Sequence, residues 1–212
     1  MKLTIRLFST LFFMAFFLPT FGQGIAPNNF IIQPYVGGPN LKTWSYNAIQ
    51  LGQTTDHDGY SVNAKGFGHF GVTTELAISE RIGLGIDGIY SPFERTIIDS
   101  SSNETKVFTE NKLRIIARIY IHFNVENPSW DLYLSGGIGA NILFTSLKRN
   151  GVNENYNAYY KGNTKFPLLN TPFPVSGRFC FGGRYYFSHY VGINFEAGIG
   201  GPPFSFGLSF RL

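Results

Sequence analysis

Residues 191–212 decide the fold of this chain, and they read VGINFEAGIGGPPFSFGLSFRL. Up to residue 199 every second residue is apolar, and Gly, Asn and Glu occupy the positions between them. After Gly201-Pro202-Pro203 the alternation starts again, with Phe or Leu at every second position to residue 212. Successive side chains of a strand point to opposite faces of a sheet, so a period of two indicates strands with one apolar face. The stretch therefore predicts two antiparallel strands joined by a short turn.

Further segments upstream show the same alternation. Strands are predicted at residues 30–36, 69–78, 82–91, 113–124, 132–144 and 175–187. Pro34 leaves the face of the first strand ambiguous, because proline cannot donate a ladder hydrogen bond. The pattern predicts an all-β chain, a single antiparallel barrel of about eight strands with up-and-down topology.

The placement of the charged residues distinguishes a membrane barrel from a soluble sandwich. From the second strand to the eighth, no Asp, Glu, Lys or Arg occupies the apolar face. A sandwich would alternate in the same way, but its polar face would meet water and be rich in Lys, Glu and Thr. Here the polar face is rich in Gly and carries Arg together with Asp and Glu. Small residues and paired charges suit the narrow lumen of a transmembrane β-barrel.

The lengths of the connections support the same interpretation. Short turns are expected at residues 79–81, 125–129 and 188–189, on the periplasmic side. Outer connections are expected at residues 39–65, 96–109, 146–171 and 201–203, and the first three of them are long. Outer-membrane barrels have short periplasmic turns and longer outer loops.

Aromatic residues make up 17% of the chain and charged residues only 14%, which is unusual for a soluble globule. Many of the aromatic residues fall near predicted strand ends, where interfacial girdles of a membrane barrel lie. These are Phe123, Trp130, Phe187, Tyr190 and Phe210 at the periplasmic ends, and Tyr90, Phe93, Phe144, Phe173 and Phe204 at the outer ends.

Residues 1–22 resemble a secretory signal peptide, and residues 23–212 would form the mature barrel domain. Lys2 and Arg6 precede an apolar stretch of about 12 residues, too short to span a bilayer, and Thr20-Phe21-Gly22 fits a cleavage site. The formal charge of +4 would fall to about +2 on cleavage, which gives no indication of nucleic-acid binding. Cys180 is the only cysteine, so no intramolecular disulfide and no cysteine-based zinc site can form.

The last strand carries a second motif. Ser205, Gly207, Phe210 and Leu212 are spaced like the signal by which the barrel assembly machinery recognises outer-membrane barrels, although the chain ends on Leu rather than on the usual aromatic residue. Together with the signal peptide, the whole mature chain resembles the small outer-membrane β-barrel proteins of the Bacteroidetes, in the broad OmpA/OmpX-like group. The resemblance implies a fold, contact with outer-membrane lipid and location in the cell outer membrane, but no particular activity.

Charged residues on the polar faces form the first candidate site. They are Glu75, Asp87, Arg114, Arg118, Arg178, Arg184, Glu196 and Arg211. Charges removed from bulk water need partners, and the interior of an eight-stranded barrel is just wide enough for side chains to fill it. We expect a structural ion network, and the alternative is a narrow pore.

No catalytic constellation, cofactor site or metal site is evident in the sequence. A lipid-modifying barrel enzyme would need Ser, His and an acid together at the outer rim, whereas Ser188-His189 fall in a predicted periplasmic turn. Asp56-His57-Asp58 offers too few ligands for a metal in a polar loop. We therefore expect a non-enzymatic protein with no cofactor.

The third outer connection is the candidate surface for a partner. Its Lys148, Arg149, Tyr156, Tyr159, Tyr160 and Lys161 combine aromatic faces with positive charge. Such residues suit an extracellular ligand, and the alternative is a merely solvated loop. The sequence thus favours a structural or surface-interaction role. An accessory role in protein secretion, as in PorT-like barrels, is the alternative that the resemblance suggests.

Overall fold

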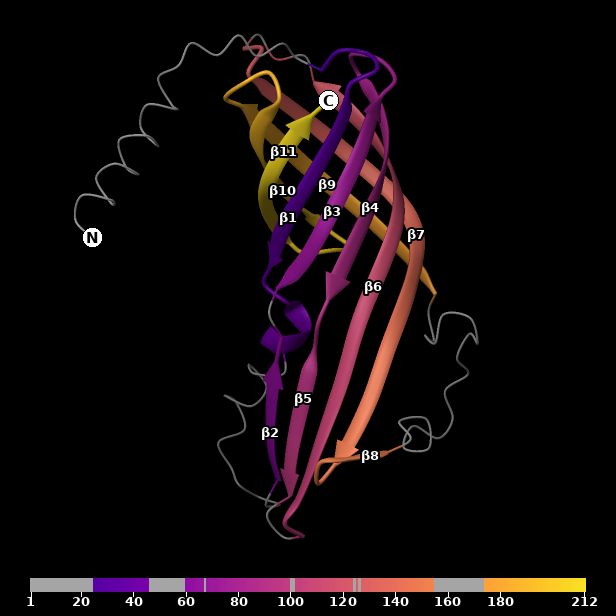
Figure 1. The fold of residues 1–212 in the computed structure, drawn as a ribbon, viewed down its shortest axis with the longest axis vertical. Coiled ribbons are helices and arrows are strands. Elements are labelled where there is room, and N and C mark those ends of the chain that lie inside the picture. Colours follow the sequence, from indigo (N-terminus) through magenta and orange to yellow (C-terminus); the bar gives the residue numbers. More distant parts are fainter. Residues whose placement is uncertain are drawn as a thin grey trace, which may run out of the picture.

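The computed structural model describes residues 25–45, 60–66, 68–99, 102–123, 125, 127–154 and 174–212, and their arrangement is shown in Figure 1. These residues form eleven strands. The strands are β1 (Phe30–Gly38), β2 (Tyr60–Lys65), β3 (His69–Ala77), β4 (Ile82–Ser91), β5 (Glu94–Asp99), β6 (Glu104–Phe123), β7 (Trp130–Arg149), β8 (Val152–Glu154), β9 (Val175–Tyr186), β10 (Val191–Ile199) and β11 (Phe204–Arg211). No helix in this part of the chain is long and apolar enough to cross a membrane.

Eight of these strands close into a barrel. In ring order they are β1, β3, β4, β6, β7, β9, β10 and β11, with β11 pairing back onto β1 and every neighbour antiparallel. Ring order follows chain order, which is up-and-down topology. The predicted all-β antiparallel barrel of eight strands is confirmed, and each strand covers one of the predicted segments.

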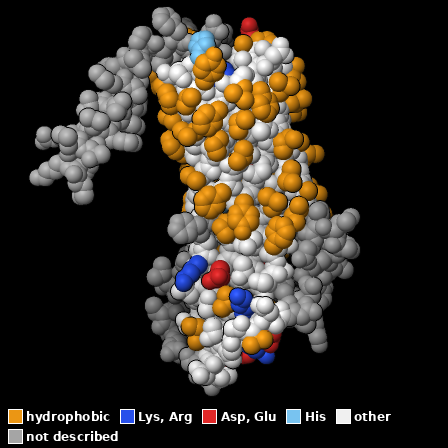
Figure 2. All heavy atoms as spheres, viewed as in Figure 1, with side chains coloured by type: hydrophobic (Ala, Val, Ile, Leu, Met, Phe, Trp, Pro, Cys, Tyr) orange, Lys and Arg blue, Asp and Glu red, His pale blue; other side chains and the backbone are white. Residues whose placement is uncertain are grey.

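The barrel wall has reversed polarity compared with a soluble protein. Along β3 and β4 buried residues alternate with exposed ones, and the exposed positions are the apolar ones. Exposed apolar side chains include Phe70, Val72, Leu76, Ile82, Leu84, Ile86, Ile115, Ile119, Ile121, Ile138, Phe179, Phe181, Phe206 and Leu208. Figure 2 shows one face of this surface, where hydrophobic side chains cover the barrel wall. A continuous apolar surface of this extent suits hydrocarbon and not water.

The two ends of the barrel differ. At one end, the short-turn end, β3 connects to β4, β6 to β7 and β9 to β10, and the hydroxyl oxygens of Ser79 and Ser188 each accept a backbone N–H within their turns at 3.0 Å. The first and last barrel strands also meet here, where Phe30 and Leu212 exchange two backbone hydrogen bonds. The barrel domain therefore begins and ends on the same side.

The opposite end carries an additional sheet. β6 and β7 are 20 residues each, whereas the other barrel strands have 8 to 12. Their excess length projects beyond the rim, where β5 and then β2 pair along β6 and β8 pairs along β7. We call this sheet the extension, and Figure 1 shows it below the barrel.

The extension corrects the prediction that residues 39–65, 96–109 and 146–171 are loops. The last residues of the first segment form β2, the second contains much of β5 and the start of β6, and the third begins with the end of β7 and includes β8. β5 and the start of β6 place polar or charged residues on both faces, and β2 and β8 are only six and three residues long. A search for long segments with one apolar face therefore does not detect them.

A small core of its own supports the extension. Phe108 on β6 is 1% exposed and lies opposite Leu147 on β7, which is also 1% exposed. On its other side Phe108 pairs with Arg95 of β5, whose guanidinium lies over the ring at 4.8 Å. Phe93, predicted to belong to an interfacial girdle, is instead buried, and the Lys42 ammonium group lies 4.1 Å from the centre of its ring. The extension is thus a packed element of the fold.

Candidate functional site in the barrel lumen

The inward faces of the barrel strands bring the candidate charged residues into one lumen. Because side chains alternate along each strand, the residues between the lipid-facing ones all point to the barrel axis. Among the predicted network residues, Glu75, Asp87, Arg118, Arg178, Arg184 and Glu196 meet in two clusters. All six are buried. The site therefore combines residues from five different strands.

The central cluster consists of Asp87, Arg118, Arg178 and Glu196. Glu196 accepts from Arg118 Nη2 and from Arg178 Nη2, both at 2.7 Å. Asp87 Oδ2 lies 3.2 Å from Arg118 Nη1 and 3.1 Å from Arg178 Nη1. Two cations and two anions therefore alternate around a closed ring, and no side chain of the four is more than 6% exposed.

Hydroxyl groups complete the central cluster. Tyr35 donates to Asp87 Oδ1 at 2.7 Å, and Tyr133 donates to Glu196 Oε1 at 2.9 Å. Thr73 donates to the same Asp87 oxygen at 3.1 Å. These partners were not predicted from the sequence, although Tyr133 falls on the polar face of its strand and so could have been included. Each carboxylate of the central cluster therefore accepts hydrogen bonds from several donors, which fix its position.

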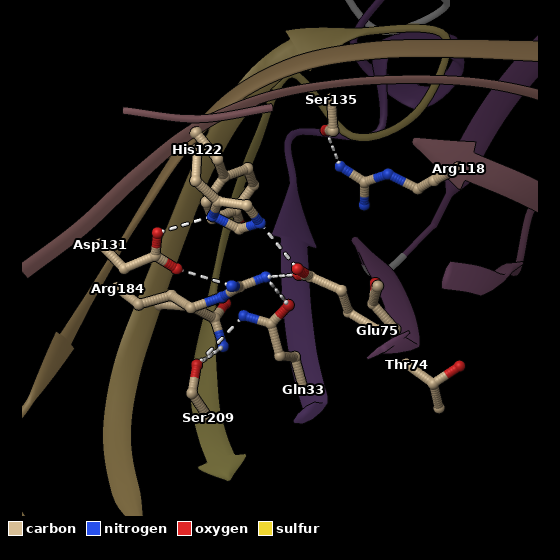
Figure 3. A network of polar contacts seen from close by, with 12 residues as sticks. Gln33, Thr74, Glu75, Arg118, His122, Asp131, Ser135, Arg184 and Ser209 are labelled. Atoms are coloured by element: carbon tan, nitrogen blue, oxygen red, sulfur yellow. Dashed lines mark hydrogen bonds and ion pairs between the residues drawn. The ribbon is translucent and has the colours of Figure 1, made fainter. Parts of the chain in front are cut away.

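The short-turn cluster consists of Glu75, His122, Asp131 and Arg184 (Figure 3). The His122 ring lies between two carboxylates, with Nδ1 2.7 Å from Asp131 and Nε2 2.8 Å from Glu75. Arg184 joins the same two carboxylates from the other side, through Nη1 to Asp131 at 2.6 Å and through Nη2 to Glu75. His122 and Arg184 therefore connect the same two carboxylates and so link β3, β6, β7 and β9.

Two of the predicted network residues lie outside both clusters. Arg114, nearer the extension, donates to the carbonyl oxygen of Gly200. Arg211, near the short-turn end, places its guanidinium 3.7 Å from the centre of the Tyr186 ring. Asp131 and His122 also belong to the network. Neither was in the predicted charged set, although the alternation of its strand places His122 on the polar face. Asp131 stands next to the start of a predicted strand, where its face was not assigned.

The candidate surface residues are only partly described. Lys148 and Arg149 end β7 in the extension, and Arg149 is ion-paired with Glu104 and lies 3.6 Å from Glu154. Tyr156, Tyr159, Tyr160 and Lys161 lie outside the described residues, as do the Asp56-His57-Asp58 segment and residues 1–22. Among the described residues, no group of three or more His, Cys, Asp or Glu side chains could hold a metal ion.

One serine does lie beside a histidine. His69 Nδ1 is 2.5 Å from Ser91 Oγ, in the lumen near the extension. In the described part of the chain no carboxylate hydrogen-bonds the other ring nitrogen, so the pair lacks the acid that orients the histidine in a catalytic triad. Cys180 is buried, and its sulfur accepts from Arg178 Nε at 3.0 Å. Ser188-His189 lie in the turn before β10, as predicted from the sequence.

The reversed polarity and the closed antiparallel ring define the class of this chain as an eight-stranded barrel of the transmembrane type. No known protein family matches the sequence, and no curated protein matches it either. Solved structures with a similar fold include a designed transmembrane β-barrel, with 11% identity over 90% of this chain and 100% of that chain at a TM-score of 0.45.

Two natural barrels from Pseudomonas aeruginosa are also similar. The N-terminal β-barrel domain of OprF shares 10% identity over 89% of this chain and 100% of that chain, with a TM-score of 0.43. The outer membrane protein OprG shares 10% identity over 90% of this chain and 99% of that chain, with a TM-score of 0.41. The fold assignment itself rests on the strand pairing of this chain.

Proposed function

We propose that this chain is an integral outer-membrane β-barrel protein with a structural or surface-interaction role, neither an enzyme nor an open pore. The observation that carries the proposal is the reversed polarity of the barrel, with apolar side chains outside and ion pairs inside. In water such a wall would expose a patch far larger than those of soluble monomers. In a bilayer the same wall contacts lipid hydrocarbon, and ring closure gives every barrel strand two hydrogen-bonded neighbours.

The lumen supports a role that does not depend on conduction. The central cluster and the short-turn cluster fill successive levels of the interior, and the fully buried rings of Tyr120 and Tyr133 contact both. Tyr120 lies against Arg118 and Arg184, and Tyr133 lies against Arg184 and donates to Glu196. Open channels use many more strands than eight. The ion pairs thus close the path and hold the strands together.

The extension supports a role at the cell surface. Outer-membrane barrels keep their short turns in the periplasm and their long elements outside, so the extension would face outward. Lys148 and Arg149 then lie on the outer side, and Tyr156, Tyr159, Tyr160 and Lys161 follow them in the sequence. Together these residues are our candidates for contact with a ligand of the cell surface. Export by a cleaved peptide of residues 1–22, and assembly through Ser205, Gly207, Phe210 and Leu212, belong to the same proposal.

The resemblance to small barrels of the Bacteroidetes leaves a PorT-like accessory role in secretion as the alternative. Co-purification of the tagged protein with secretion components from its own cells would favour that role. Isolation of the barrel alone under the same mild extraction would favour the surface role.

Orientation and membrane insertion can be tested together by cysteine labelling of intact cells. Cys180 is buried and should not react, so a single introduced cysteine reports its own location. We expect Lys148→Cys, in the extension, to react with a membrane-impermeant maleimide on intact cells. The matched variant Glu80→Cys, in an exposed turn at the short-turn end, should react only after the outer membrane is permeabilised. The reverse pattern would contradict the proposed orientation, and recovery of the protein in the soluble fraction would contradict the membrane location.

A further inference from the structure

A cavity of about 630 Å³ lies at the end of the lumen where the extension begins. We call it the vestibule. It lies beyond the central cluster, between the helical turn at residues 41–45 and the inward faces of β3, β4, β6, β7 and β9. Its volume falls in the range of pockets that take small organic ligands, roughly 300 to 1,000 Å³.

Positive charge dominates the vestibule. Lys112 and Arg114 are two residues apart on β6, so both point to the lumen, and both line the cavity. Lys42 and Glu110 also line it, but they form an ion pair with each other. In the part of the chain that the structure describes, Lys112 has no acidic partner, and Arg114 donates to a backbone carbonyl. The two cations are therefore not neutralised by the walls of the cavity.

The central cluster cannot supply the missing negative charge. Its two carboxylates are already shared between Arg118 and Arg178, and Arg178 lies towards the vestibule, with its guanidinium near Gly201 in the lining. Arg114 therefore lines the cavity together with Lys112, and Arg178 lies next to Gly201 without lining the cavity itself. A half-buried cation without a counter-charge is costly, so an anion in the vestibule would gain from both cations at once.

We propose that the vestibule is a binding site for a small water-soluble anion that carries a carboxylate or phosphate group. Arg114 would hold the oxyanion through its planar fork, and Lys112 would contribute a second charge from the same strand. Leu41, Phe93, Leu143 and Val175 line the remaining wall and would contact the carbon body of the ligand. The cavity lies at the end of the lumen next to the extension, so the ligand enters from the water on that side.

Calorimetric titration of the purified full-length barrel in a neutral maltoside detergent tests this site, with citrate and inorganic phosphate as probes. We expect saturable binding of one citrate per chain. Lys112→Gln and Arg114→Gln should each weaken it by about tenfold, the usual effect of losing one charge-assisted hydrogen bond. The matched control is Arg81→Gln, which removes the same charge from an exposed turn at the short-turn end, far from the vestibule, and should change the affinity by less than about twofold.

Each variant is first shown to be folded by its mobility on gels with and without boiling. If Arg114→Gln does not fold, Lys112→Gln carries the test, because Lys112 lies at the rim of the barrel and outside both ion clusters. The proposal would be overturned if neither citrate nor phosphate bound saturably to the wild type. Equal weakening by Arg81→Gln, or unchanged affinity in both vestibule variants, would also overturn it. None of these outcomes depends on where the protein resides in the cell. A failure of the anion site is therefore distinguishable from a failure of the proposed function, which the cysteine labelling tests.

Discussion

Replacing Glu196 by Gln should destabilise the barrel strongly, because this carboxylate connects both arginines of the central cluster. Glu196 accepts four hydrogen bonds, from Arg118 Nη1 at 3.3 Å, Arg118 Nη2 at 2.7 Å, Arg178 Nη2 at 2.7 Å and Tyr133 at 2.9 Å. Gln keeps the size of the side chain but has one acceptor oxygen, and its amide N–H groups face other donors. Two guanidinium groups would then share Asp87 alone.

The expected loss in the free energy of unfolding is about 3 to 5 kcal/mol, the range for breaking a buried ion pair. The full range applies because the Glu196 side chain is only 6% exposed, so water can do little to solvate the arginines left without their carboxylate. Urea titration of the barrel in lipid vesicles measures the loss through the fluorescence of Trp130, which packs against Tyr185 at 5.1 Å between ring centres.

The control variant is Glu80→Gln, which removes the same charge from an exposed turn and should change the stability by less than about 0.5 kcal/mol. A double-mutant cycle with Arg178→Gln should show a coupling energy on the order of 1 to 3 kcal/mol, since the two side chains are in direct contact. The reasoning is refuted if Glu196→Gln lowers the stability by less than about 1 kcal/mol, or by no more than Glu80→Gln does.

Three further outcomes follow from the lumen. Gly182→Ala should lower the unfolding free energy by about 1 to 3 kcal/mol in the same urea assay, because the Cβ of the new alanine would lie 2.4 Å from the Tyr133 ring. The control Gly88→Ala should be tolerated, because the atom nearest to its Cβ would be 3.8 Å away. His122→Leu should cost on the order of 3 kcal/mol in that assay, because it leaves two facing carboxylates with one guanidinium, and a stability equal to wild type would contradict the cluster. In planar bilayers the wild-type barrel should give no stable, large unitary currents, and regular large steps would disprove the filled lumen.

The vestibule and the two clusters show a division of roles along the lumen. The central cluster pairs two arginines with two carboxylates, whereas the level at the extension retains excess positive charge and open volume. A barrel whose inner part is a structural plug can thus still offer a binding site at its mouth.

The sequence by itself determined the strands of the membrane wall and which face of each strand is apolar. It could do so because lipid imposes one requirement on every outward position, so the alternation of residues 191–212 recurs around the whole ring. The strands of the extension could not be predicted in this way. They satisfy their backbone by pairing and bury only a few side chains, such as Phe108 and Leu147, and those contacts leave no periodic apolar face in the chain.

Only the tertiary structure decided which charges meet. Strand periodicity assigns Arg118 and Glu196 to the lumen, but they are 78 positions apart, and their contact at 2.7 Å depends on the stagger and closure of the ring. The same closure separates Arg114 from the clusters and leaves it, with Lys112, facing the vestibule. A period of two specifies the face of a sheet on which a side chain lies, whereas the height and the angle at which side chains meet inside a barrel depend on how all eight strands are sheared against one another.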